Sequence, residues 1–227
     1  MAIAKVSGGI AVLLGVAVAV PLMLAPVAQA LTSPSPLDAY LEDLRTLRAT
    51  FLQTLTDANG REIDRATGTL IVSRPGKFSW EIHPETAGRG AQARAGQLMV
   101  SDGRNLWFLD RDLDQVTVKP LDAALSATPA MLLSGTVDVR RNFTLTPAGQ
   151  RAGLDWVLVE PRGADADFRR ALFGFAGREL KQMILEDKLA QTATIVFERV
   201  ERNGPVAAQE LSFTPPPGTD VIGTPGQ

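Results

Sequence analysis

The feature that most constrains this sequence is a long succession of short segments in which hydrophobic and polar residues alternate. Turn residues such as Asp57-Ala58-Asn59-Gly60 and Asp102-Gly103 separate these segments. Alternation with a period of two is typical of strands with one buried face, and short strands at close spacing favour an antiparallel sheet curled into a barrel or half-barrel. The predicted strands are Arg48–Thr56, Arg65–Ser73, Lys77–Ile82, Gln97–Ser101, Arg104–Leu109, Gln115–Lys119, Phe143–Thr146, Leu154–Glu160, Ala171–Phe175, Glu179–Glu186, Thr192–Val200 and Gln209–Phe213.

Two segments favour helices instead. Ser35 and Pro36 form a typical helix start, and apolar residues then recur at helical spacing as far as Leu47, which predicts an amphipathic helix of about three turns. A second helical piece is expected within Leu121–Gly135, where Thr128 precedes Pro129. The chain after Gly218 reads as a tail.

The first 30 residues differ in composition from the rest. Lys5 is their one charged residue, an apolar stretch runs from Val6 to Leu24, and Ala28-Gln29-Ala30 follows where that stretch ends. This order predicts a signal peptide, residues 1–30, that is cleaved after Ala30. A retained membrane anchor is the alternative, because the stretch is long enough to span a bilayer. We expect residues 31–227 to form a single exported domain.

Composition argues against several functional classes. The 23 basic and 25 acidic residues give a net charge of −2, which does not favour binding of nucleic acid. The sequence has no cysteine and one histidine, His83, so a zinc site of the ordinary type is not expected. Asp110, Asp112 and Asp114 alternate but do not complete a calcium-binding loop. We expect no metal, no cofactor and no enzymatic activity, although catalysis by two carboxylates brought together by the fold stays open.

Four motifs, in order along the chain, resemble the LolA family of periplasmic carriers of outer-membrane lipoproteins. The motifs are Val72-Ser73-Arg74-Pro75-Gly76-Lys77-Phe78-Ser79-Trp80, Val100-Ser101-Asp102-Gly103-Arg104-Asn105-Leu106-Trp107-Phe108, Thr128-Pro129-Ala130-Met131-Leu132-Leu133 and Phe213-Thr214-Pro215-Pro216-Pro217-Gly218. The similarity covers nearly all of Pro36–Gly218. Two regions depart from it: the loop Thr86–Gln97 is longer than usual, and Asp165–Phe175 matches poorly.

The resemblance implies a mainly β fold with helices, namely an unclosed antiparallel barrel of about eleven strands with a helical lid. It implies a cavity for the acyl chains of lipoproteins, which such carriers receive from the inner-membrane ABC transporter LolCDE and pass to the outer-membrane receptor LolB or a substitute. LolB has the same fold but is itself a lipoprotein. The missing cysteine therefore favours the carrier, which we expect to be a periplasmic monomer.

The resemblance also implies roles for individual residues. Counting by twos, Arg74 shares a strand face with Leu70 and Val72, so if these face the interior its guanidinium does too and needs hydrogen-bond acceptors there. The alternative is that Arg74 caps the strand end before Pro75 and lies in water. The residues that the family pattern places in a latch holding the lid closed are Arg74, Leu41, Leu133 and Ser134. Those expected to line the acyl-chain cavity are Leu70, Val72, Phe78, Trp80 and Met131.

The same fold could serve a different purpose. A periplasmic regulator could use such a cavity to detect a lipid and then signal to a protein partner. Regulators of this kind usually carry a further domain, and the sequence after Gly218 predicts none. The carrier is therefore the favoured hypothesis.

Overall fold

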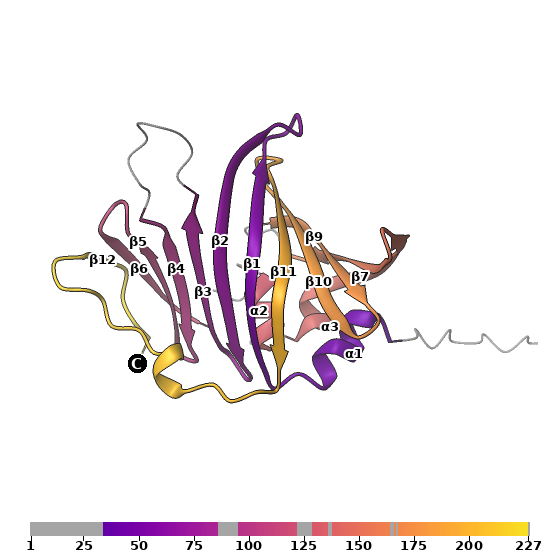
Figure 1. Cartoon of the computed structure of the whole chain (residues 1–227). Helices are drawn as coiled ribbons and strands as arrows, with labels where there is room; N and C mark the ends of the chain where they lie inside the picture. Colours follow the sequence, from indigo (N-terminus) through magenta and orange to yellow (C-terminus); the bar gives the residue numbers. More distant parts are fainter. Residues whose placement is uncertain are drawn as a thin grey trace, which may run out of the picture. The chain divides into compact units, whose positions relative to one another are not determined.

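Twelve strands form one sheet in the computed structural model, which describes residues 34–85, 95–121, 129–135, 138–163, 166 and 168–226 (Figure 1). The strands are β1 (Thr46–Thr56), β2 (Glu62–Ser73), β3 (Lys77–Pro84), β4 (Gln97–Asp102), β5 (Asn105–Asp110), β6 (Gln115–Pro120), β7 (Phe143–Arg151), β8 (Leu154–Pro161), β9 (Phe168–Ala176), β10 (Glu179–Asp187), β11 (Thr192–Arg202) and β12 (Asp220–Ile222). Their order across the sheet is β12-β6-β5-β4-β3-β2-β1-β11-β10-β9-β8-β7.

The sheet is strongly curved but not closed, because its two edge strands, β12 and β7, do not pair with each other (Figure 1). Strands β1 to β11 pair antiparallel throughout. The short β12 pairs parallel with β6. The expected unclosed barrel of about eleven antiparallel strands is therefore confirmed, and β12 is an addition from a segment that was predicted to be a tail.

The concave face of the sheet holds the main hydrophobic core. In β2, Leu70 and Val72 are fully buried while their neighbours in the strand are not, as a period of two requires. Leu70 pairs with Trp80 and Val72 with Phe78 across the β2–β3 ladder, so these four side chains point to the same side. The face predicted for these strands is thus the interior of the fold.

A second, smaller core lies on the convex face of β4, β5 and β6. Its buried residues are Val100, Trp107, Leu109, Val116 and Val118. Phe213 packs against Trp107 with ring centroids 5.4 Å apart, so the chain after β11 covers this part of the outer face. Here the prediction of a strand over Gln209–Phe213 was wrong. Ala208–Leu211 form a 3₁₀ helix, in which the Glu210 carboxylate accepts a hydrogen bond from the Ala207 N–H instead of leaving it to a ladder.

Helix α1 (Pro36–Glu42) begins as the sequence predicted and ends earlier. Ser35 caps it, accepting a hydrogen bond at Oγ from the Asp38 N–H at 3.2 Å. Asn203 Oδ1 then accepts hydrogen bonds from the N–H groups of Arg45 and Thr46, which fixes the start of β1. Leu47 belongs to that strand, where it pairs with Val72. The expected three turns were too many, because leucines at helical spacing also fit the inward positions of a strand.

Two more helices accompany the sheet. Helix α2 (Pro129–Ser134) packs on the concave side against β2 and β3, and the residues from Ala130 to Ser134 are buried (Figure 1). Helix α3 (Val139–Asn142), which the sequence did not predict, contacts β7, and α1 contacts β8. The expected second helix is thus present at Pro129–Ser134, while residues 122–128 of the predicted segment lie outside the described residues.

Other predictions also fall outside the described part of the chain. The signal peptide and its cleavage site lie in residues 1–33, and most of the loop Thr86–Gln97 lies in residues 86–94. Within the described ranges, no helix is long and apolar enough to cross a membrane.

Candidate functional site

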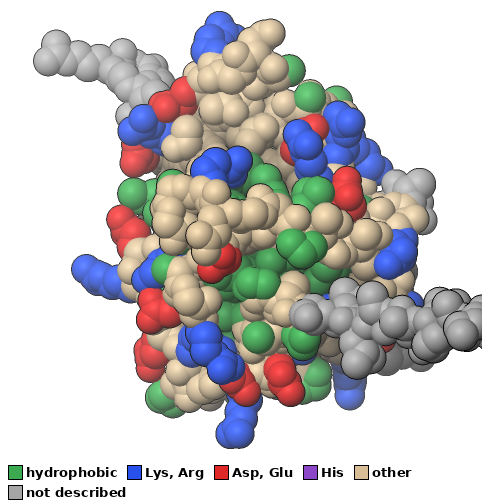
Figure 2. All heavy atoms as spheres, turned by 90° about the vertical axis from the view of Figure 1, so that its right-hand side faces the viewer, with side chains coloured by type: hydrophobic (Ala, Val, Ile, Leu, Met, Phe, Trp, Pro, Cys, Tyr) green, Lys and Arg blue, Asp and Glu red, His purple; other side chains and the backbone are tan. Residues whose placement is uncertain are grey.

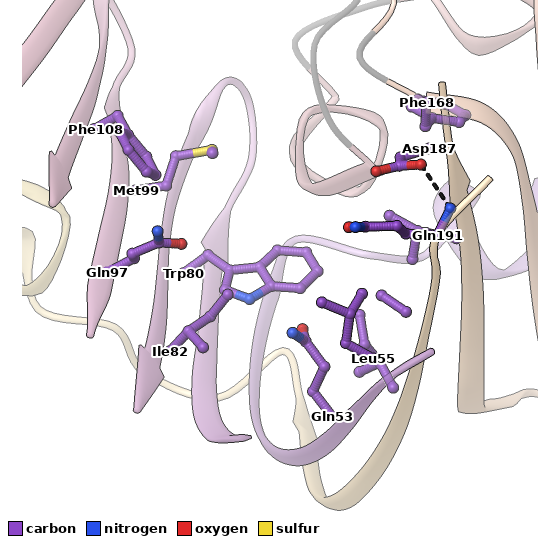
Figure 3. Close-up of a pocket in the computed structure, with 13 residues that line it drawn as sticks. Gln53, Leu55, Trp80, Ile82, Gln97, Met99, Phe108, Phe168, Asp187 and Gln191 are labelled. Carbon is purple, nitrogen blue, oxygen red and sulfur yellow. Dashed lines mark hydrogen bonds between the residues drawn. The ribbon is translucent and has the colours of Figure 1, made fainter. Parts of the chain in front are cut away.

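A pocket of about 290 Å³ opens on the concave side of the sheet (Figure 3). Strands β1, β3, β4, β5, β9, β10 and β11 all contribute side chains to it, so it spans most of the curved sheet. Its lining is mostly apolar. The lining residues are Gln53, Leu55, Trp80, Ile82, Gln97, Met99, Phe108, Phe168, Leu185, Asp187, Gln191, Ala193 and Ile195.

The inner wall of the pocket depends on a glycine in β2. Gly68 faces the interior between β1 and β3, and a Cβ atom there would lie 2.3 Å from Cζ of Phe51. The Phe51 ring therefore rests directly on the backbone of β2. This position brings Phe51 against Trp80 edge to face, with ring centroids 5.6 Å apart. The packed aromatic pair fixes Trp80 as one wall of the pocket.

Four polar side chains interrupt the apolar lining, and three of them lie where strands begin or end. Gln97 is the first residue of β4, Asp187 is the last of β10, and Gln191 precedes β11. Asp187 Oδ1 accepts hydrogen bonds of 2.8 Å from the N–H groups of Leu189 and Gln191, which holds the β10–β11 turn (Figure 3). Gln53 is the fourth. The pocket thus combines an apolar interior with polar groups near the strand ends.

Three of the four predicted latch residues, Arg74, Leu41 and Ser134, lie around the β2–β3 turn. Arg74 Nη1 donates a hydrogen bond to the carbonyl oxygen of Leu41 in α1 at 2.5 Å. The Gly76 N–H donates to the carbonyl oxygen of Ser134 in α2 at 2.8 Å. Burial lowers the pKa of the Arg74 guanidinium from its ordinary value, yet arginine stays charged in proteins. The segment between β2 and β3 therefore contacts both helices through backbone carbonyls.

The guanidinium of Arg74 also lies against the end of α2. A Cβ atom on Gly135 would lie 2.6 Å from Nε and 2.7 Å from Nη2 of Arg74. Leu133, the remaining latch residue, is fully buried in the main core. Together these contacts place α1, α2 and the β2–β3 turn around one charged side chain.

Of the residues predicted to line a cavity, Trp80 lines the pocket. Leu70, Val72, Phe78 and Met131 face the same interior but are fully buried within the main core and do not line this pocket. Sequence reasoning did place Ile82 on the same face as Trp80, although it did not assign it to a cavity. The polar members Gln53, Gln97, Asp187 and Gln191 were missed, because nothing in the sequence distinguishes them from solvent-exposed residues of strands and turns.

The described residues contain no group of three or more His, Asp or Glu side chains that could hold a metal ion. His83 is half exposed, with Nε2 3.7 Å from Oε2 of Glu81. Lys/Arg and Asp/Glu side chains are interspersed on the face shown in Figure 2, so the described residues on that face form no large patch of one charge.

The model of the family described as outer membrane lipoprotein carrier protein LolA matches residues 42–214. The outer-membrane lipoprotein carrier protein of Dechloromonas aromatica is 41% identical over 184 residues, which are 81% of this chain and 84% of that protein. Its counterpart from Methylobacillus flagellatus is 36% identical over 187 residues, covering 82% and 87% of the two chains.

Among solved structures, a LolA superfamily protein from Nitrosomonas europaea aligns over 78% of this chain and 96% of its own, with 10% identity and a TM-score of 0.44. The family match spans most of the described sheet, from the end of α1 to the segment that covers its convex face. The chain therefore belongs to the LolA family of outer-membrane lipoprotein carrier proteins.

Proposed function

We propose that this protein carries lipoproteins through the periplasm and holds their acyl chains in the pocket on the concave face. The observation that carries the proposal is an apolar pocket in a sheet whose edges do not pair, in a chain that belongs to a family of lipoprotein carriers. An acyl chain in water costs about 0.8 kcal/mol per CH₂, so a chain of roughly 16 carbons costs about 12 kcal/mol. Covering such a chain needs apolar walls and no reacting group, and we propose no enzymatic activity.

The pocket is small for the cargo that we propose. Its volume of about 290 Å³ lies at the lower limit of pockets for ligands of drug size, which occupy roughly 300–1,000 Å³. Several acyl chains need more room than this. We propose that loading moves the helices on the concave side, α1, α2 and α3, here called the lid, away from the sheet. The predicted cavity residues Leu70, Val72, Phe78 and Met131 would then become accessible to acyl chains.

The contacts of Arg74 supply a reason for the carrier to release its cargo. They tie α1 to the β2–β3 turn in the closed state, and moving the lid breaks them. Any free energy that they contribute to the closed state is lost on loading, so it weakens binding of the cargo by the same amount. We propose that Arg74, with Leu41, Leu133 and Ser134, is the latch that favours unloading.

We propose that residues 1–30 direct export and are then removed, and that the mature protein works as a periplasmic monomer. The inner-membrane transporter LolCDE would supply the cargo, and LolB or a substitute receptor in the outer membrane would accept it. A carrier between two such partners has to bind acyl chains reversibly, which a cavity with a movable lid allows.

The direct test is to purify the protein from the periplasm under native conditions and to analyse an organic extract by mass spectrometry. Triacylated lipoprotein that copurifies supports the carrier. A stable complex with a periplasmic protein and no lipoprotein would instead support the lipid-sensing regulator.

A further inference from the structure

Trp80 has an indole N–H that is buried without a hydrogen-bond acceptor. Trp80 is 8% exposed, and among the described residues Nε1 has no hydrogen-bond partner. The other two tryptophans are satisfied. Trp107 Nε1 donates to Oδ2 of Asp102 at 2.8 Å, and Trp156 Nε1 donates to the carbonyl oxygen of Arg151 at 3.1 Å. Buried donors are almost always paired, and Trp80 Nε1 is one of five buried side-chain polar atoms without a partner among the described residues, so it requires an explanation.

The unpaired donor is part of the pocket. In Figure 3 the indole of Trp80 projects into the space between the strands, and its nitrogen is on the side where Gln53 lies. Two apolar side chains of the lining are neighbours of Trp80: Ile82, two residues further along β3, and Met99, which is paired with Trp80 on β4. A ligand in the pocket would therefore meet the N–H beside an apolar surface.

The charges of the lining indicate what kind of acceptor fits. None of the described lining residues is Lys, Arg or His, and Asp187 contributes a carboxylate. An anionic group would meet no cation here and would be repelled by Asp187. A neutral oxygen attached to apolar chains meets neither difficulty. The carbonyl oxygen of an acyl ester has these properties.

We infer that Trp80 Nε1 is a specificity-determining hydrogen-bond donor, which binds the carbonyl oxygen of an acyl ester when the chains of a glycerol-linked lipid occupy the pocket. This inference rests on the proposed carrier function and deepens it. The pocket would then recognise the ester linkage between acyl chain and glycerol, and it would also shield the acyl chains from water. A site built to hydrogen-bond a ligand discriminates against an analogue that lacks the bonding group, because its own polar atom then stays buried and unpaired.

The test compares two lipopeptides that differ at the linkage. One carries an S-(2,3-diacyloxypropyl)cysteine, and the other is its dialkyl ether analogue with the same chain lengths and no ester carbonyl. We expect the wild-type protein to bind the ester about tenfold more tightly, which corresponds to about 1.4 kcal/mol. In Trp80→Phe, which keeps an aromatic ring against Phe51 and removes the N–H, the ratio should fall to about one.

The ratio of the affinities for the ester and the ether lipopeptide is the decisive quantity, because lost packing in Trp80→Phe weakens the binding of both ligands alike. Equal affinities in the wild-type protein would overturn the inference. If neither lipopeptide binds, the proposed carrier function fails first. Repeating the comparison with diacyl and dialkyl phosphatidylethanolamine shows whether the preference extends to phospholipids. An ester preference in either lipid class supports the donor role and identifies the source of the ester.

A second measurement uses Trp80→Phe only to assign an NMR signal. The three indole N–H groups give separate signals in a ¹⁵N-correlated NMR spectrum, and Trp80→Phe identifies the signal of Trp80. We expect the ester lipopeptide to move the Trp80 proton signal downfield and the ether analogue to leave it near its position without ligand. Trp107 and Trp156, whose donors are already paired, serve as internal controls. Equal movement with both ligands would contradict a hydrogen bond to the ester.

Discussion

Nε of Arg74 lies where Gly135 leaves room for it: a Cβ atom on residue 135 would be 2.6 Å away. Gly135 has a φ of +71°, and it follows α2 directly. The glycine thus serves two purposes, since it ends the helix in a left-handed conformation and admits the guanidinium to the helix end. In the latch that we propose, this pair acts together with the hydrogen bond from Arg74 to Leu41.

Replacing Arg74 by leucine should trap cargo on the carrier. The variant loses the contacts that favour the closed state and gains apolar surface, so the loaded state gains relative to the empty one. A charge-assisted hydrogen bond contributes about 1.5 kcal/mol or more, which corresponds to roughly tenfold tighter binding of lipoprotein. The measurement is the transfer of labelled lipoprotein from purified carrier to receptor. Arg74→Lys should fall in between, because one ammonium group cannot reproduce the forked donors. Transfer by Arg74→Leu at the wild-type rate would show that Arg74 is not a latch.

Gly135→Ala should weaken the same latch while leaving Arg74 in place. The new Cβ displaces the guanidinium, so slow transfer is expected together with a loss of about 1 kcal/mol in the free energy of unfolding from the positive φ. Gly149→Ala is the matched control, since Gly149 has a φ of +73° with nothing within 4 Å of its Cβ position. The control should lose the same stability and transfer normally. Combined with Arg74→Leu, Gly135→Ala should slow transfer no further; additive effects would separate the two residues.

Ala193→Phe should block the pocket. Ala193 lines it from β11, and a phenyl ring there fills space that an acyl chain would occupy. We expect lipoprotein capture to fall severalfold or more in a pull-down, with the circular dichroism spectrum unchanged. Thr194→Phe, one residue further on the opposite face of β11, adds the same ring outside the pocket and should capture normally. Normal capture by Ala193→Phe would mean that acyl chains bind elsewhere.

Asp38 should make the lid sensitive to acid. Burial acts to raise its pKa, but hydrogen bonds from Ser35 and Arg140 outweigh burial and hold the pKa of this carboxyl below its ordinary value. A lowered folded-state pKa stabilises the fold above the unfolded-state pKa, and this contribution is lost as pH falls through the folded-state value. At neutral pH, Asp38→Asn should therefore lower the free energy of unfolding by about 1 kcal/mol.

Urea unfolding of both proteins across a pH series tests this expectation. The advantage of the wild type should be largest at neutral pH and shrink progressively below a pH of about 4, the ordinary pKa of aspartate. An advantage that does not change with pH would show that the Asp38 charge is not its source. Ser35→Ala is a useful companion variant, because it removes one donor to Asp38 and leaves the carboxyl itself.

Processing gives a prediction about the mature N-terminus. If residues 1–30 are a cleaved signal peptide, N-terminal sequencing of protein from the periplasmic fraction should begin at Leu31. Full-length chain recovered from inner membranes would favour the retained anchor instead.

Alternation in the sequence predicted the faces of the strands well, and it did so for a physical reason. Residues such as Leu70, Val72 and Trp80 share one face because the period of a strand is two, whatever the rest of the chain does. The unclosed barrel with a helical lid came from the resemblance of four motifs to a known family, and the order of the strands was not predicted. Alternation alone does not say which strands are neighbours.

The level at which the pocket lies along the strands was not predictable from alternation. Phe78 and Trp80 face the same interior, yet Phe78 is fully buried in the core and Trp80 lines the pocket. The difference comes from long-range register, which places Gly68 of β2 between Phe51 and Ile82 and so brings Phe51 against Trp80. The end of α1 was missed for a related reason. The spacing of Leu47 fits a helix locally, but in the folded chain Leu47 pairs with Val72 in the sheet.

The polar side chains near the strand ends bear on how empty molecules behave toward one another. A pocket opening lined only by apolar side chains would expose a hydrophobic patch, and two carriers without cargo could then associate through these patches. We expect the neutral amides of Gln97 and Gln191, next to the Asp187 carboxylate, to hydrogen-bond water and keep this part of the lining hydrated. We expect concentrated empty protein to remain dispersed, because self-association would strip water from these amides. An acyl chain has no polar groups whose hydrogen bonds to water would be lost on entry. It can therefore pass these amides, which oppose the association of two carriers.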